Sequence, residues 1–214
     1  MNKVIAFSLW GNNPIYTIGA IENKELAKKH YPDWTCRYYI GKSTNCEIVE
    51  QLKDVNTEII LMDSDGDWTG MFWRFECASE TNVDVMISRD TDSRLNSRES
   101  NAVNQWLKSN KDFHIMRDHP YHNTEILGGM WGVRNGLLSD IKDDIKKYVK
   151  GDFWQVDQNF LKEIVYPKVK NNTFVNDEFF EKKPFPTNRK NKYFVGQAFN
   201  EKNIPLHPEH MLQL

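Results

Sequence analysis

Strand-like and helix-like patterns alternate along the first 115 residues of the chain. Short runs rich in β-branched and aromatic residues, typical of strands, occur at residues 4–9, 36–40, 58–62, 83–88 and 113–116. Amphipathic helical patterns lie between them at residues 14–30, 46–54, 67–79 and 97–109, and a further one follows at 139–149. Strands that alternate with helices form right-handed βαβ units. The sequence therefore predicts an α/β fold whose central, mainly parallel mixed sheet is flanked by helices.

Length, charge and cysteine content limit the class of protein. At 214 residues the chain is long enough for one sizeable core, so we expect a single domain over residues 1–214. Lys and Arg number 28 against 30 for Asp and Glu, which gives no electrostatic reason to expect a nucleic acid or an anionic membrane as partner. No apolar run approaches a membrane span. The three cysteines, an odd number without metal-ligand spacing, suit reduced thiols, and we expect a cytoplasmic protein.

Polar segments follow the first four predicted strands: WGNN, GKS, DSDGD and RDTDSR. Ligands of an open α/β sheet bind in the crevice beyond the carboxyl ends of its strands. We therefore expect these segments to converge on a binding site. DSDGD resembles the start of a calcium loop, but Gly66 stands at the fourth position instead of the sixth, and Arg74 replaces the closing glutamate. This segment does not qualify as an EF-hand.

Two aspartates, Asp90 and Asp92, stand at the end of the fourth predicted strand. Hard divalent cations such as Mg²⁺ and Mn²⁺ prefer oxygen ligands, commonly one or two carboxylates completed by phosphate oxygens and water. Arg89 and Arg94 beside the pair are placed to balance its charge or to meet a phosphate. Taken alone, the motif equally fits a polar turn before the helix at 97–109, whose N-terminus favours negative charge. Its position after a fourth strand of an alternating series favours the metal site.

The turn Asp90-Thr91-Asp92 resembles the Asp-x-Asp motif of GT-A nucleotide-sugar-dependent glycosyltransferases. The stretches VIAFSLWGNNPIY, SRDTDSRL, FHIMRDHPYH and GGMWGVR are similar to an N-terminal glycosyltransferase domain of large chlorella-virus proteins and to related small bacterial and viral glycosyltransferases. This resemblance covers nearly the whole chain. It implies a GT-A, Rossmann-like fold, with residues 1–115 as the nucleotide-binding half and residues 116–214 as the half that binds sugar and acceptor.

The same resemblance implies a set of ligands and a setting. The donor is expected to be a UDP-sugar, the cofactor Mn²⁺ or Mg²⁺, and the acceptor an oligosaccharide or other glycan. The sugar transferred is expected to be a hexose or deoxyhexose of the glucose, galactose or rhamnose type. The resemblance further implies glycan synthesis for a viral glycoprotein in the host cytoplasm, and a chain that belongs to a larger polypeptide with further domains.

Residues in the predicted nucleotide-binding half match the family's nucleoside contacts. Ser8, Leu9 and Trp10 end the first strand and form the first βα turn, which in these enzymes contacts the nucleoside. The segment GMFWRFECAS resembles the helix before the metal motif, whose arginine often reaches the nucleotide, and this points to Arg74. The alternative for Arg74 is an ordinary surface arginine.

The segment ILGGMWGVRNG, residues 126–136, resembles the glycine-containing stretch that lies beneath the donor sugar. Gly128 and Gly129 would then allow close approach of the backbone, and Trp131 would stack on a sugar face. The alternative is a glycine-rich turn followed by a core tryptophan.

Three further residues are candidates in the second half. Asp157 lies at the start of a helix and is the candidate general base, which must reach the attacking hydroxyl; its alternative role is a helix cap. His119, in the segment MRDHPYHNTE, has a His-x-x-His spacing to His122 that resembles a zinc site, but no third ligand with a recognisable spacing follows. We therefore expect His119 to lie near the acceptor. His207 resembles, as a loose match, the C-terminal histidine that serves some GT-A enzymes as third metal ligand, and it equally fits a solvated tail.

The pattern weakens after residue 167. Residues 168–192 contain two prolines and a basic cluster, and we expect an irregular loop there. A late strand is predicted at YFVGQAF, residues 193–199, and a tail follows it.

Three functions are compatible with these residues. The first is a metal-dependent glycosyltransferase. The second is a phosphohydrolase or phosphotransferase with an Asp-x-Asp nucleophile and acid pair, although that chemistry normally places the nucleophile after the first strand. The third is a sugar-nucleotide-binding domain without turnover. Release of UDP from UDP-sugars in the presence of metal distinguishes the first from the other two.

Overall fold

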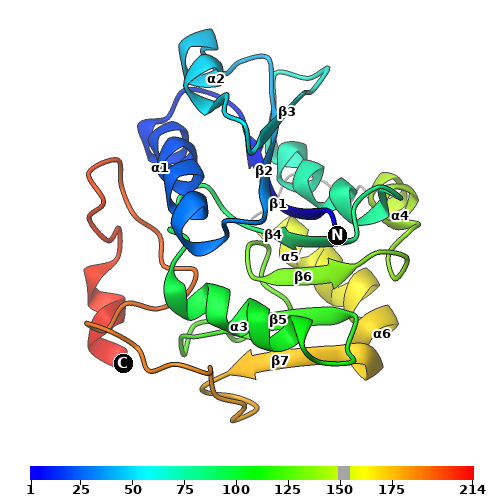
Figure 1. Ribbon diagram of the computed structural model, residues 1–214, viewed down its shortest axis with the longest axis vertical. Coiled ribbons are helices and arrows are strands. Elements are labelled where there is room, and N and C mark those ends of the chain that lie inside the picture. The colour runs from blue at the N-terminus through cyan, green and yellow to red at the C-terminus, as the bar shows by residue number, and fades with distance from the viewer. Residues whose placement is uncertain (149–154) are drawn as a thin grey trace.

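The computed structural model describes residues 1–148 and 155–214, and within them seven strands form one mixed sheet (Figure 1). The strands are β1 (Lys3–Leu9), β2 (Thr35–Ile40), β3 (Thr57–Leu61), β4 (Val85–Ser88), β5 (Phe113–Arg117), β6 (Trp131–Arg134) and β7 (Thr173–Asp177). Their order across the sheet is β3-β2-β1-β4-β6-β5-β7. The pairs β1–β2, β2–β3, β1–β4 and β5–β7 are parallel, and β6 is antiparallel to β4 and β5. The predicted α/β fold with a mainly parallel mixed sheet is confirmed.

The five predicted strands are all present, and the errors concern the later chain. β6 lies in the segment predicted to run beneath the sugar, and β7 lies in the segment predicted to be irregular. The strand predicted at residues 193–199 is wrong, since only an isolated bridge between Phe199 and Pro205 occurs there. Gly196 has a φ of 82° and turns the chain, while Val195 packs into a small cluster with Met116 and Phe185. The apolar residues of that segment are thus buried without forming a ladder.

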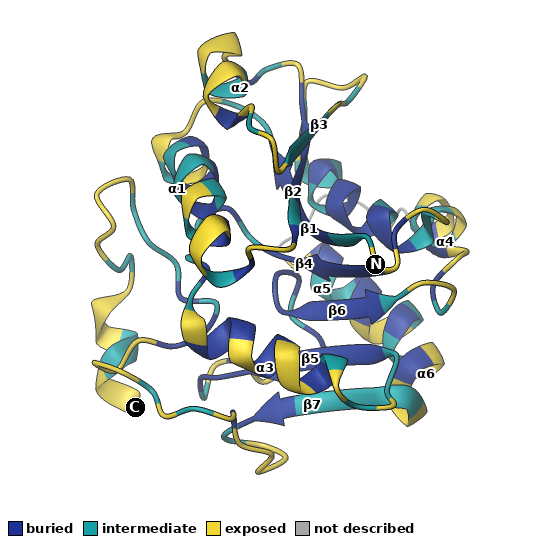
Figure 2. Ribbon diagram, viewed as in Figure 1, coloured by how far each residue is buried: buried dark blue, intermediate teal, exposed yellow. Residues whose placement is uncertain are grey.

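Helices cover both faces of the sheet (Figure 2). The side chains of β1 alternate between these faces and so contribute to two hydrophobic clusters, one on each face. Ile5, Phe7 and Leu9 point toward α1 (Pro14–His30), α2 (Cys46–Leu52) and α3 (Ser97–Leu107). Val4 and Ala6 point to the other face, which packs against the 3₁₀ helix η1 (Trp68–Ser79), α4 (Ile141–Tyr148) and α5 (Val156–Phe160). Burial of this apolar surface on both faces stabilises the sheet.

Side-chain caps begin the helices on the first face. Asn13 Oδ1 accepts a hydrogen bond from the Ile15 amide at 3.1 Å, and Pro14 follows as the first helical residue, as predicted. Asn96 Oδ1 accepts from the Glu99 amide at 3.0 Å at the start of α3. Asn96, and not the aspartate pair, therefore caps the helix that follows the Asp-x-Asp turn.

The remaining helices are short. α5 continues into the π helix η2 (Leu161–Val165), α6 (Tyr166–Val169) and the 3₁₀ turn η3 (Lys170–Asn172), and η4 (Pro208–Gln213) lies close to the C-terminus. The helical pattern at 67–79 is a 3₁₀ helix that begins after Asp67, whose carboxylate accepts from the Thr69 amide. Val149, the last residue of the predicted helix 139–149, lies outside the described residues. Among the described helices, none combines the length and apolar character needed to cross a bilayer.

Candidate active site

A cavity of about 760 Å³ lies at the carboxyl ends of β1 and β4. Its walls come from the loop after β1, from η1, from the turn after β4 and from the start of α5. The lining residues include Ser8, Leu9, Trp10, Gly11, Asn12, Asn13, Tyr16, Trp68, Met71, Arg74, Asp90, Thr91, Asp92, Gly128, Gln155, Asp157 and Gln158. Two of the four predicted polar segments, WGNN and RDTDSR, thus reach the cavity, whereas GKS and DSDGD do not line it. A cavity of this size suits a small-molecule ligand.

Asn23, a fully buried residue of α1, holds the turn that carries the two aspartates. Its Nδ2 donates to the carbonyl oxygens of Thr91 and Ser93 at 3.3 and 2.9 Å, and its Oδ1 accepts from the Leu95 amide at 3.0 Å. One side chain therefore satisfies three backbone groups of the turn. Sequence reasoning missed Asn23, although an amide on the inner face of an amphipathic helix is a detectable signal.

Asp90 and Asp92 both line the cavity. Burial, and then repulsion from the Asp90 carboxylate, raises the pKa of Asp92 to about 6. Burial, followed by the charges of Asp92 and Asp90, also raises the pKa of Tyr16, which lies close enough to sense both carboxylates. Tyr16 was not predicted. Two carboxylates that repel each other across an open cavity form an oxygen donor set that fits a hard divalent cation.

Arg74 lies between two carboxylates of the cavity. Its Nη2 is 2.9 Å from Oδ1 of Asp90 and 3.5 Å from Oδ2 of Asp157. Its backbone amide donates to Ser8 Oγ at 3.1 Å, which joins η1 to the end of β1. The side chain is buried, and its Nε has no hydrogen-bond partner among the described residues. Arg74 is therefore not an ordinary surface arginine, and it retains one unused donor.

Asp157 faces the cavity from α5. Burial raises the pKa of its carboxyl group and the charge of Asp90 adds to this, while Arg74 opposes it. The helix begins at Val156, and Asp157 Oδ1 accepts from the amide of the next residue, Gln158, at 2.9 Å. Asp157 thus lies inside the first turn and is not the helix cap, which was its alternative role.

Gly128 and Gly129 allow the backbone to approach the carboxylates. A Cβ atom on Gly128 would lie 2.6 Å from Asp157 Oδ2 and 2.8 Å from Arg74 Nη2, and one on Gly129 would overlap the Asp90 carboxylate. The Gly128 carbonyl accepts from Ser88 Oγ at 2.7 Å, which fixes this segment beside the end of β4. The backbone at both glycines thus closely approaches side chains of the cavity, and the predicted approach to a donor sugar stays a prediction.

Trp10 is held in one orientation at the cavity wall. Three glycines pack against it, and a Cβ on Gly70 or Gly41 would lie 2.8 or 2.9 Å from its side chain, while one on Gly66 would overlap it. Its ring meets that of Trp73 edge-on, with centroids 5.8 Å apart. The segments GKS and DSDGD, which contain Gly41 and Gly66, therefore support the cavity from behind.

No protein-family model and no curated protein matches the chain. Solved structures do match. A glycosyltransferase involved in the glycosylation of the major capsid of PBCV-1 is 17% identical with a TM-score of 0.59, and 100% of each chain is covered. The galactosyltransferase LgtC is 10% identical with a TM-score of 0.54, over 83% of this chain and 74% of that one. A 4-diphosphocytidyl-2C-methyl-D-erythritol synthase from Anaerococcus prevotii is 11% identical with a TM-score of 0.52, over 88% and 93%.

These matches extend over most or all of the chain. The chain has a GT-A glycosyltransferase-like fold. The fold expected from the resemblance is thereby confirmed, while the identities are too low to carry more than the fold.

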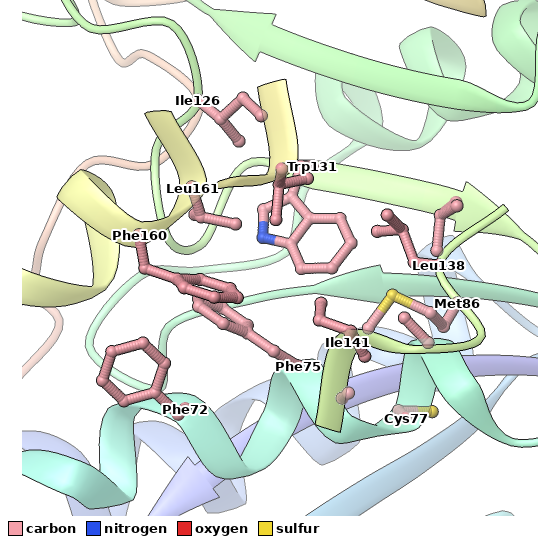
Figure 3. Packing of buried hydrophobic residues seen from close by; sticks show 14 of the residues in the cluster. Phe72, Phe75, Cys77, Met86, Ile126, Trp131, Leu138, Ile141, Phe160 and Leu161 are labelled. Carbon is pink, nitrogen blue, oxygen red and sulfur yellow. The ribbon is translucent and has the colours of Figure 1, made fainter. Parts of the chain in front are cut away.

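Two residues expected at the ligand site of the GT-A fold belong to its interior instead. Arg89 is 2% exposed, and its Nε donates to Glu99 at 2.7 Å while its Nη1 donates to the Ser88 carbonyl. The predicted phosphate contact of Arg89 is wrong, because its side chain is enclosed. Trp131 is fully buried in β6 and lies in the core beside Phe75 (Figure 3). Its ring stacks on Phe113 with centroids 5.5 Å apart. It is the core tryptophan of the alternative interpretation and offers no face to a sugar.

The two predicted histidines do not line the cavity of this GT-A fold. His119 is 1% exposed; its Nδ1 accepts from the Tyr121 amide and its Nε2 lies 3.0 Å from the His210 carbonyl. His207 lies with Glu209 and His210, and not with the aspartates, in the group of metal-capable side chains found among the described residues. The structure thus brings together Arg74, the two aspartates and Asp157, but neither His119 nor His207.

Proposed function

We propose that the chain is a metal-dependent glycosyltransferase that transfers a hexose or deoxyhexose from a UDP-sugar to a glycan acceptor. The observation that carries the proposal is the grouping of Asp90, Asp92, Arg74 and Asp157 around one cavity. The cavity lies where ligands of open α/β sheets bind. The likeness to a glycosyltransferase involved in the glycosylation of the PBCV-1 major capsid is the ground for proposing a viral glycoprotein glycan as acceptor. We place the transfer in the cytoplasm as part of the same proposal.

Asp90 and Asp92 would hold Mn²⁺ or Mg²⁺ in the proposed enzyme. The ion, when bound, supplies Lewis-acid neutralisation of the leaving diphosphate. The donor set supports this assignment, because both carboxylates face the cavity and the Asp90 side chain is 43% exposed. The turn is also rigid, since Asn23 bonds its backbone, and rigid ligands lose less entropy on binding.

Arg74 would change partners when donor binds. In the structure its guanidinium neutralises Asp90 at 2.9 Å. If Asp90 and Asp92 hold a cation, the Arg74 guanidinium would be free to donate, through its unused Nε as well, to diphosphate oxygens of the donor. Trp10, fixed against its three glycines, would provide the wall for the nucleoside.

Asp157 would accept the proton of the attacking acceptor hydroxyl. A carboxylate with a raised pKa is a better general base, and burial raises the pKa of Asp157. This role belongs to an inverting reaction, in which the base stands opposite the leaving group. In a retaining reaction Asp157 would position the sugar or the acceptor.

The direct test is release of UDP from UDP-glucose, UDP-galactose and UDP-rhamnose by the full chain with Mn²⁺, with and without a glycan acceptor. We expect acceptor-dependent release. UDP with Mn²⁺ should raise the melting temperature, because a ligand at 100 times its Kd stabilises the folded state by about 2.7 kcal/mol. Asp92→Ala should abolish both effects, while Asp63→Ala, at a fully exposed aspartate away from the cavity, should keep both.

Each alternative function has its own outcome in this experiment. Binding of sugar nucleotides without turnover would identify a non-catalytic binding domain. Hydrolysis of a generic phosphate ester that Asp90→Asn abolishes would identify a phosphohydrolase. Pyrophosphate release from a nucleoside triphosphate and a sugar phosphate would identify a nucleotidyltransferase, the class that the name of one structural match, a glucose-1-phosphate thymidylyltransferase from Bacillus anthracis, denotes. Absence of any sugar-nucleotide binding would overturn the proposal.

A further inference from the structure

A second group of metal-capable side chains lies at η4, near the C-terminus. His207, Glu209 and His210 each offer a ligand atom, and these atoms lie within 4.8 Å of one another. The group is outside the cavity lining described above. It combines two imidazoles with one carboxylate, whereas the Asp90–Asp92 pair offers oxygen atoms alone.

The spacing within this group approaches that of a bound metal. His207 Nδ1 and Glu209 Oε1 are 3.2 Å apart. Two ligands about 2.0 Å from a tetrahedral Zn²⁺ lie about 3.3 Å from each other. The His207 and His210 rings are stacked, with centroids 4.9 Å apart and planes at 21°, so the two imidazoles lie side by side. The two exposed members, His207 and Glu209, leave an entry path from solvent.

The protein supports the backbone of this segment. His119 Nδ1 accepts from the Tyr121 amide, so its Nε2 carries the proton and donates to the His210 carbonyl at 3.0 Å. Gln213 Nε2 donates to the Tyr121 hydroxyl at 2.6 Å. His119 has both ring nitrogens engaged and is not available as a ligand. These contacts position the chain that carries the three ligands.

We propose that His207, Glu209 and His210 bind a transition-metal ion, with Zn²⁺ the best match and water in the fourth position. Imidazole nitrogen suits Zn²⁺, whereas Mg²⁺ prefers a shell of oxygen ligands. The site is independent of the proposed glycosyltransferase activity, which uses the aspartate pair. Binding would hold the C-terminal segment 207–213 against the loop that follows β5.

The test is a competition titration of the full chain with Zn²⁺ and a chromophoric chelator. The Asp90→Ala/Asp92→Ala double variant serves as the starting protein, because it lacks the oxygen-only pair. We expect one equivalent of Zn²⁺ to bind this variant. His207→Ala or His210→Ala added to it should weaken binding at least about tenfold, since even outer-shell changes at metal sites cost that much. Zn²⁺ should also raise the melting temperature of the double variant.

Controls separate this site from other sources of binding. His207→Ala is the main variant, because its side chain is 60% exposed and its removal should leave the fold intact. His30→Ala, at the end of α1, is the matched histidine control and should bind Zn²⁺ as before. A Zn²⁺ affinity of the His207→Ala and His210→Ala proteins that equals the affinity of the starting double variant would overturn the proposal. So would loss of Zn²⁺ binding on removal of the aspartates, or equal binding of Mg²⁺. None of these results bears on UDP release, so the two proposals fail separately.

Discussion

Arg74 and Arg89 are two buried arginines near the same Asp-x-Asp turn, and they have opposite surroundings. Arg89 pairs with Glu99 at 2.7 Å, both side chains are 2% exposed, and Tyr31 donates to the same glutamate. Arg74 pairs with Asp90 at 2.9 Å, and that carboxylate is 43% exposed at the cavity. Both are ion pairs, but only one has a partner that a ligand can reach.

The difference shows how a buried arginine can be assigned a role. A charge whose partner is equally enclosed contributes to folding, and removing either member leaves the other without compensation in the interior. A charge whose partner faces a cavity can change partners when a ligand enters. Arg89 therefore belongs to the structure of the turn, and Arg74 to its chemistry. Substitutions at the two arginines separate these two roles.

The largest effect is expected for Arg89→Met on stability. Glu99 would be left buried without its cation, and breaking a buried pair in this way costs about 3–5 kcal/mol. The free energy of unfolding in urea measures this loss. Arg89→Met combined with Glu99→Leu removes the stranded charge and should recover most of the stability. If the free energy of unfolding of the single variant fell by less than about 1 kcal/mol, the Arg89–Glu99 pair would not be needed for stability.

Arg74→Met should have the reverse profile. The proposed loss of diphosphate contacts lowers kcat/KM by about 10²–10³-fold, as for removal of one preorganised donor in other enzymes. Stability should fall less than in Arg89→Met, because Asp90 remains hydrated at the cavity. Steady-state UDP release and urea unfolding give the two readouts. Arg74→Lys keeps the charge but loses the planar guanidinium fork, so its kcat/KM should lie between that of the wild type and that of Arg74→Met. Unchanged kcat/KM in Arg74→Met would remove Arg74 from the site.

The contrast also explains what the sequence could and could not predict. The strands β1 to β5 and the Asp-x-Asp turn follow from local patterns and from the rule that ligands bind beyond the strand ends. Arg74 and Arg89 were both expected at the ligand, but only Arg74 lines the cavity, because the direction in which each side chain packs depends on tertiary contacts that have no local sequence signal. Arg89, next to the motif, was expected at the ligand, yet it turns inward to Glu99.

The later chain shows a second limit. Gly-Gly-Met-Trp has the composition of a turn, and the same four residues lead into β6, which enters the sheet antiparallel between β4 and β5. That position buries Trp131, so its aromatic ring serves the core. The third-ligand role expected for His207 depended on where an irregular tail lies. Contacts such as the Phe199 amide to the Asp92 carbonyl, at 2.8 Å, decide that path and have no local signal.

The smallest effect expected is a pH dependence of stability that originates at Asp157. Burial raises the pKa of Asp157 above its ordinary value of 3.8, so the folded state keeps this proton to a higher pH than the unfolded chain does. The contribution of the Asp157 carboxyl group to the free energy of unfolding is fully present below pH 3.8 and is lost as the pH rises through the pKa of the group in the folded state. The free energy of unfolding of Asp157→Asn, minus that of the wild type, should therefore increase as the pH rises above 3.8.

Asp140→Asn is the control with the opposite sign. Lys168 Nζ lies 2.9 Å from the Asp140 carboxylate and lowers the pKa of that group, so its contribution is present above 3.8 and lost as the pH falls. The difference for Asp140→Asn should therefore decrease as the pH rises. Arg74 opposes the shift at Asp157, so the slope should be steeper when Asp157→Asn is made in the Arg74→Met background. Urea unfolding at a series of pH values above and below 3.8 measures all three slopes. A slope for Asp157→Asn of the same sign as that for Asp140→Asn would contradict a raised pKa of Asp157, and with it the view that Arg74 neutralises this carboxylate only in part.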